Sequence, residues 1–104
     1  MTETIKGEPQ AETRKEGVAA LLEERGARYG DFADHARISC ALKVAMWEHI
    51  VARGVTLADD QEEAIAMICH KLARIANGDP DYIDNWDDIA GYATLVADRL
   101  RRDG

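Results

Sequence analysis

The chain of 104 residues lacks long apolar runs and an excess of positive charge. No segment approaches the roughly 20 consecutive apolar residues that cross a bilayer, so we expect no membrane span. The first residues, "MTETIKGEPQ", have no apolar core of a signal peptide, which favours a cytoplasmic location. The net charge is −7, from 13 basic and 20 acidic residues. Because contact with phosphates along a strand needs a basic surface, we do not expect direct binding to nucleic acid.

Cysteine is scarce, and the common catalytic motifs are absent. Cys40 and Cys69 both lie in apolar, helix-like segments. In a reducing compartment a disulfide is not expected, so both are interpreted as small buried apolar residues. The sequence contains no glycine-rich phosphate loop and no G-x-S-x-G motif. Neither a P-loop enzyme nor a serine hydrolase is therefore indicated.

The pattern along the chain predicts one all-α domain behind a short polar arm. Residues 1–12 are polar and contain a glycine and a proline, which is typical of a disordered arm. Residues 13–104 form the domain, in which a first short helix starts at the capping box of Thr13 and Glu16 and ends at Gly26. Three further helices follow, ending near Arg53, Asn77 and Arg102. No segment alternates as a strand does, so we expect a small bundle of about four helices.

Dimerisation is predicted from the second helix, which ends near Arg53. It carries two apolar stripes, which together cover more than half of its circumference. A helix that is apolar on most sides is either central or shared with a second subunit. The connection between the third and fourth helices, which starts at Asn77, is short, so these two helices should form an antiparallel hairpin. We therefore expect a bundle that is completed in a homodimer.

The segment "DYIDNWDDIAGYA", residues 81–93, places four aspartates where the last helix begins. In an antiparallel hairpin Lys71 lies level with Asp87 and Asp88, and Arg74 lies level with Asp84. Asp84 and Asp88 share a helix face and could both reach one Mg²⁺ ion. Acidic residues in a first turn also cap a helix and complement its dipole. The residues alone leave both interpretations open.

Two motif-bearing stretches carry a resemblance, "ERGARYGDFADHA" at residues 24–36 and "MICHKLARIANGDPDYIDNWDDIAGYA" at residues 67–93. Over residues 16–98 the chain resembles a family of small helical proteins from tailed phages and prophages. The resemblance implies a phage origin and a helical fold, and it brings no settled activity.

More distantly, the chain looks like the all-α nucleoside triphosphate pyrophosphohydrolases of the MazG-like and dimeric dUTPase group. Those enzymes hold magnesium with E-x-x-E on one helix and E-x-x-D on the next. Asp88 matches the last aspartate, but Asn85 stands where the preceding glutamate would be. Glu62 and Glu63 begin the other helix without the E-x-x-E pattern.

These features lead to a nucleotide-directed function as the leading hypothesis, with catalysis left open. Asp84 and Asp88 would hold Mg²⁺, and Lys71 and Arg74 would neutralise developing phosphate charge while Glu63 orients water. The remaining nucleotide contacts are assigned to the "YGDF" turn and the last helix: Tyr29, Asp31, His35 and Tyr92. One alternative is a nucleotide-binding protein without catalysis. Another is an acidic phage protein that binds and inhibits a basic host protein.

Overall fold

The protein is built from four helices, as a computed structural model shows for residues 2–104, with side chains described from residue 15 onward. The helices are α1 (Thr2–Tyr29), α2 (Phe32–Ala52), α3 (Asp59–Asn77) and α4 (Ile83–Asp103). Residues 2–104 contain no strand, so the all-α prediction is confirmed. Within the described part of the chain, no helix combines the length and apolarity needed to cross a membrane.

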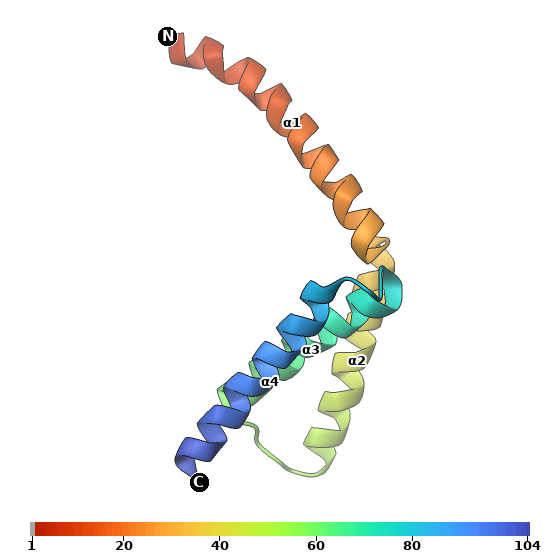
Figure 1. Ribbon diagram of the computed structural model, residues 1–104, viewed down its shortest axis with the longest axis vertical. Helices are drawn as coiled ribbons and strands as arrows, with labels where there is room; N and C mark the ends of the chain where they lie inside the picture. The colour runs from red at the N-terminus through yellow and green to blue at the C-terminus, as the bar shows by residue number, and fades with distance from the viewer. Residues whose placement is uncertain (1) are drawn as a thin grey trace.

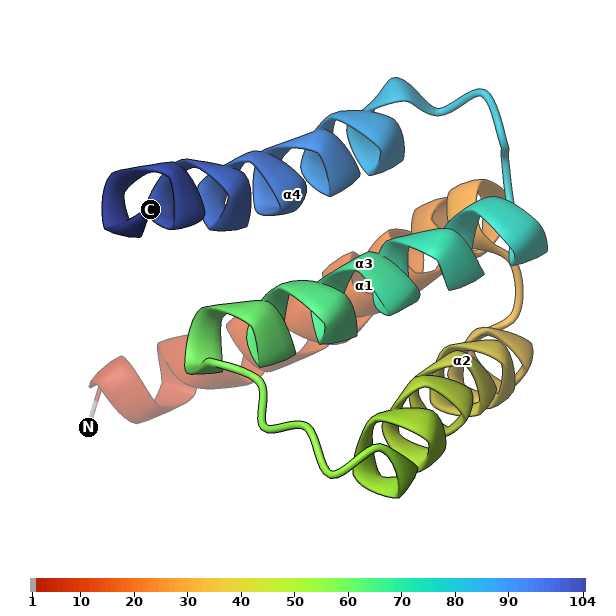
Figure 2. The same cartoon turned by 90° about the horizontal axis from the view of Figure 1, so that it is seen from below.

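Helix α3 is the centre of the fold. It packs against α2 on one side and α4 on the other, and α2 and α4 do not contact each other. Figure 2 shows α3 running between them. Helix α1 touches α2 and α3 only near its end and then projects away from the other three helices (Figure 1). The alternative that placed the second helix at the centre is therefore wrong, because α3 holds that place.

Helix α1 is longer than the sequence predicts at both ends. It passes through Gly26, the predicted stop, and ends at Tyr29. The chain turns at Gly30, which has a φ of +81°, a value that glycine adopts without strain. At the other end the helix reaches back to Thr2, across the stretch assigned to a disordered arm. Residues 15–27 are all exposed, so this part of α1 has no tertiary cover in a single chain.

A close-packed corner joins the ends of α1 and α3 to the start of α2. The side-chain amide of Asn77 donates hydrogen bonds to the carbonyl oxygens of Tyr29, at 3.0 Å, and Asp31, at 2.8 Å. The backbone N–H of Asp79 donates to the carbonyl oxygen of Arg28 at 2.6 Å. Gly78 lies so close to Tyr29 that a Cβ would collide with its backbone. These contacts fix the junction of three helices.

The α3–α4 hairpin has the predicted register. The Lys71 ammonium lies 2.9 Å from an oxygen of Asp88. Further along, the guanidinium of Arg99 donates two hydrogen bonds to Asp60, at 2.7 and 2.9 Å. A bidentate pair of this kind also fixes geometry, so it locks one helix against the other. The antiparallel hairpin inferred from the short connection is thereby confirmed.

The apolar core within one chain is small. Among residues 15–104, only Ala64, Cys69 and Ala73 are buried apolar residues, and all three lie on α3. Cys69 is buried as expected, but Cys40 is exposed, so that part of the prediction is wrong. Both cysteines are free thiols, as predicted. No large aliphatic or aromatic side chain of the described residues is fully buried.

Candidate functional site

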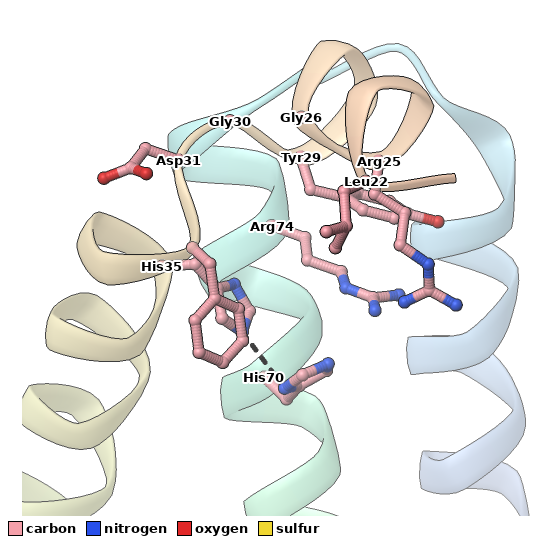
Figure 3. Close-up of a pocket in the computed structure, with 10 residues that line it drawn as sticks. Leu22, Arg25, Gly26, Tyr29, Gly30, Asp31, His35, His70 and Arg74 are labelled. Atoms are coloured by element: carbon pink, nitrogen blue, oxygen red, sulfur yellow. Dashed lines mark hydrogen bonds between the residues drawn. The ribbon is translucent and has the colours of Figure 1, made fainter. Parts of the chain in front are cut away.

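The junction of α1, α2 and α3 holds a pocket of about 420 Å³. The end of α1, the turn after it, the first turn of α2 and the last turns of α3 all contribute to it (Figure 3). Its walls are formed by these ten residues: Leu22, Arg25, Gly26, Tyr29, Gly30, Asp31, Phe32, His35, His70 and Arg74. Four of the predicted site residues, Tyr29, Asp31, His35 and Arg74, are brought together here.

Two histidines form one wall of this pocket. The Nε2 atom of His35 lies 3.1 Å from the Nδ1 atom of His70, and the rings meet nearly edge to face, at 81°. His35 is only 5% exposed, and its Nδ1 atom has no hydrogen-bond partner. A buried polar atom without a partner is costly and calls for a specific explanation. Because this atom is enclosed by protein, it is a cost to the fold and not a contact point for a ligand.

Both imidazoles favour the neutral form. Burial lowers the pKa of His70 to about 4, and the nearby positive charge of Arg74 acts in the same direction. Burial also lowers the pKa of His35, again with Arg74 as the next cause. At neutral pH each ring therefore offers one N–H donor and one acceptor. The pair can hydrogen-bond a ligand, and it can accept a proton if a negative charge arrives.

Two arginines from different helices give the pocket its charge. The Arg74 guanidinium stacks on the Tyr29 ring, 4.0 Å from its centroid, which fixes its position. Arg25 reaches the same pocket from α1 (Figure 3). The carboxylate of Asp31 points away from the two guanidinium groups in the same view. Helix α2 also begins at this wall, so its positive dipole end adds to the field.

The rest of the pocket wall is apolar and aromatic. Leu22 is 63% exposed and Phe32 is 76% exposed, although both are large apolar residues. The Phe32 ring stacks on His35 with 5.9 Å between ring centroids. Planar and apolar surfaces beside guanidinium groups suit a ligand that carries both a flat ring and an anionic group.

The predicted metal ligands lie elsewhere. Asp84 accepts a hydrogen bond from the hydroxyl of Tyr82 at 2.7 Å, and Asp88 is paired with Lys71. Neither carboxylate lines the pocket between α1, α2 and α3. Within the described residues, no group of three or more histidine, cysteine, aspartate or glutamate side chains is arranged to hold a metal ion. Asp88 would have to leave Lys71 before its carboxylate could hold a metal ion.

The other predicted contacts are also dispersed. Glu63 is exposed and lines a separate hollow with Trp47, between α2 and α3. Tyr92 is half-buried on α4 and is not part of the pocket. Arg74 was expected level with Asp84, but its side chain turns toward α1 and stacks on Tyr29. The sequence analysis grouped these residues into one site, whereas in the structure they lie in separate parts of the fold.

Arg25 and His70 were missed as site residues. The first lies on one face of α1 with Leu22, Gly26 and Tyr29, spaced as one helix face requires. This helix face was not recognised in the sequence, because the helix was expected to end at Gly26, before Tyr29. His70 and Arg74 are four residues apart on α3, a spacing that signals a shared face.

The fold is therefore a three-helix layer centred on α3, with a projecting α1 and a positively charged pocket at the junction. The chain belongs to the family described as a domain of unknown function, DUF6378, whose model matches residues 15–100. That match covers all four helices except the first part of α1 and the end of α4. No curated protein matches the chain, and no solved structure does.

Proposed function

We propose that this protein binds a phosphate-bearing small molecule of the nucleotide class in the pocket between α1, α2 and α3. The observation that carries the proposal is the convergence of Arg25, Arg74 and the hydrogen-bonded His35–His70 pair on one cavity. The chain as a whole carries a net charge of −7, so a local cluster of positively charged side chains is opposite in sign to the overall charge. Local positive charge in an acidic protein favours a specific anion site over a general basic surface.

The chemistry of the pocket walls supports this ligand class. The planar fork of an arginine guanidinium matches phosphate oxygens, and two arginines can hold one phosphate from two sides. The start of α2 adds free backbone N–H groups, which bind anions well. Phe32 and Tyr29 offer aromatic faces for a nucleobase. A volume of about 420 Å³ is in the range of small-molecule pockets.

The resemblances noted above extend this proposal. A phage or prophage origin would place the ligand in the host cytoplasm. The similarity to MazG-like enzymes suggests a magnesium-dependent pyrophosphohydrolase as the alternative. That activity would need Asp88 to leave Lys71, 2.9 Å away, before the carboxylate could serve a metal. Binding without turnover needs no such rearrangement, so it is the simpler function for this geometry.

Binding is tested by calorimetry with a panel of nucleoside mono- and triphosphates and inorganic phosphate. A nucleotide should bind, and Arg25→Ala should weaken it by about 10- to 100-fold, since a charge-assisted hydrogen bond contributes roughly 1.5–3 kcal/mol. The matched control is Arg102→Ala, which removes the same charge from the exposed end of α4. Equal affinity loss in both variants, or no binding by any member of the panel, would overturn the proposal.

Turnover is tested on the same samples. After incubation with and without Mg²⁺, the bound nucleotide should be recovered unchanged by chromatography. Release of pyrophosphate or phosphate that requires Mg²⁺ and is lost in Asp88→Asn would instead establish the enzymatic alternative. The folded fraction of that variant must be measured in parallel, because the substitution also breaks the Lys71 ion pair.

A further inference from the structure

One side of the α3–α4 hairpin is apolar and uncovered. We call it the α3–α4 apolar face, and it consists of Ile65, Ile68 and Leu72 on α3 with Trp86, Ala93 and Leu100 on α4. Leu72 is 40%, Trp86 49% and Leu100 46% exposed. An apolar groove of about 280 Å³ runs along it, between Ile65 and Ile68 on one helix and Ala93 on the other. This face is separate from the pocket of the proposed function, which uses other residues.

The exposed area of the chain is larger than a monomer of this size normally leaves. The accessible surface is 7659 Å². A folded monomer of 11.5 kDa exposes about 5,800 Å², so the excess is roughly 1,900 Å². A standard interface covers roughly 800 Å² on each partner, so the excess is large enough for one such interface. The buried apolar residues in the described chain are three small ones, so the hairpin lacks an internal core.

The order of residues on α4 identifies the partner as a second copy. Trp86, Ala93 and Leu100 are spaced by seven, with the smallest side chain at the centre and large ones at both ends. An antiparallel copy of the same helix would set Trp86 against Leu100 twice, and the two Ala93 side chains would allow close approach at the two-fold axis. We propose that the protein forms a two-fold homodimer through the α3–α4 apolar face, with the two α4 helices antiparallel across Ala93.

Charge along the edge of this face agrees with that arrangement. Asp87 follows Trp86, and Arg101 follows Leu100. An antiparallel pairing brings each acidic residue opposite the basic residue of the other copy, whereas a parallel pairing would oppose like charges. Arg101 pairs with Asp98 at 3.0 Å on the exposed surface, and such a pair contributes little to stability and is readily exchanged.

The opposite side of α4 does not take part. That side carries Asp84, Asp88, Gly91 and Leu95. Nothing lies within 4 Å of the position that a Gly91 side chain would occupy, and Leu95 is 68% exposed. That side carries paired carboxylates and one large apolar residue, so it offers far less apolar area than the α3–α4 apolar face.

The mass of the protein in solution, measured by light scattering over a dilution series, tests the proposal. The unmodified chain should be a dimer, and Ala93→Glu should raise the dissociation constant at least about 100-fold, because two carboxylates would meet at the axis. Leu95→Glu, on the opposite side of α4, is the matched control and should leave the dimer intact. Circular dichroism checks that both variants remain helical, which is expected because both positions are exposed in one chain.

Other outcomes would overturn the proposal. A monomer at all concentrations is one of them. A dimer that survives Ala93→Glu but dissociates with Leu22→Glu would place the interface on α1 instead. As a second measurement, a short bis-maleimide should link two copies of A93C, made in a C40S/C69A background, and should not link L95C in the same background. Failure to link A93C while the dimer persists counts against the antiparallel geometry.

Discussion

The Nε2 atom of His35 lies 3.1 Å from the Nδ1 atom of His70, so two neutral imidazoles share one hydrogen bond between α2 and α3. Positive groups surround the pair: Arg74 and Lys71 on α3, and Lys43 on α2. A proton added to either ring would place one more positive charge among them. Two pH effects follow, one on the stability of the free protein and one on ligand binding.

The free protein should lose stability as the pH falls from 6.5 toward 4. The pKa of His70 is about 4 in the folded state and 6.5 when unfolded, so the unfolded chain binds more protons in this window. The contribution of neutral His70 to the free energy of unfolding is therefore complete above pH 6.5, and it is lost as the pH decreases toward 4. Because the ring is partly exposed, we expect a loss of about 1–2 kcal/mol in the free energy of unfolding. Urea unfolding at half-unit pH steps measures it.

The control compares two histidine variants by the slope of stability against pH. His70→Gln should flatten the slope between pH 6.5 and 4, since the group that takes up the proton is gone. His49→Gln, at an exposed position near the end of α2, should keep the slope of the unmodified protein. Identical slopes in all three proteins would show that the histidine pair does not control this loss.

Ligand binding should take up protons at mildly acidic pH. An anion in the pocket would offset the positive field of Arg74 and raise the pKa of His35 and His70 from their lowered values. Affinity for an anionic nucleotide should therefore increase as the pH falls from 7 toward 5. Calorimetry in two buffers of different ionisation enthalpy measures the protons directly, and an uptake of up to about one proton is expected. Proton release, or equal heats in both buffers at pH 5.5, would contradict this.

Much of the fold could be predicted because its signals are local. The α3–α4 connection contains Gly78 and Pro80, which stop one helix, and the apolar spacing on each side fixed the two helical segments. Counting back from that turn correctly placed Lys71 beside Asp88. The residue at which α1 ends could not be predicted from such local signals. Gly26 and Gly30 are equally good stop signals, and only the hydrogen bonds of Asn77 to Tyr29 and Asp31 decide between them.

The site was harder because it depends on long-range contacts. The "YGDF" turn was recognised, and Tyr29, Asp31 and His35 do reach one pocket. Their partners, His70 and Arg74, come from a segment 35 or more residues later, and no local pattern shows that they face the turn. Asp84 and Asp88 were predicted as metal ligands because four aspartates lie close together in this segment of the sequence. In the fold one meets Tyr82 and the other Lys71.

Asp88→Asn should destabilise the protein more than Asp84→Asn does. The Lys71 side chain is only 11% exposed, and its charge would lose its partner 2.9 Å away. We expect a cost of about 1–2 kcal/mol, less than for a fully buried pair because Asp88 is itself half-exposed. Asp84 is exposed and accepts one hydrogen bond from Tyr82, so its replacement should cost about 0.5 kcal/mol or less. Thermal and urea unfolding of the two variants give the comparison.

Two glycines should respond in opposite directions to replacement by alanine. Gly91 lies in the interior of α4, and nothing stands within 4 Å of its missing Cβ. Gly91→Ala should therefore stabilise the protein by about 0.5–1 kcal/mol, because alanine has the higher helix propensity. Gly30 has a φ of +81°, and a Cβ there would collide with Asn77. Gly30→Ala should destabilise by about 2 kcal/mol or more.

The pair of glycine variants also separates local from global effects. Gly30→Ala distorts the wall of the pocket, so it should weaken nucleotide binding as well as stability, whereas Gly91→Ala should leave binding unchanged. Both quantities come from unfolding curves recorded with and without the nucleotide, since a ligand that binds only the folded state shifts the midpoint. A loss of stability in Gly91→Ala would mean that a second molecule packs on that side of α4. The α3–α4 apolar face would then not be the only covered surface of the hairpin.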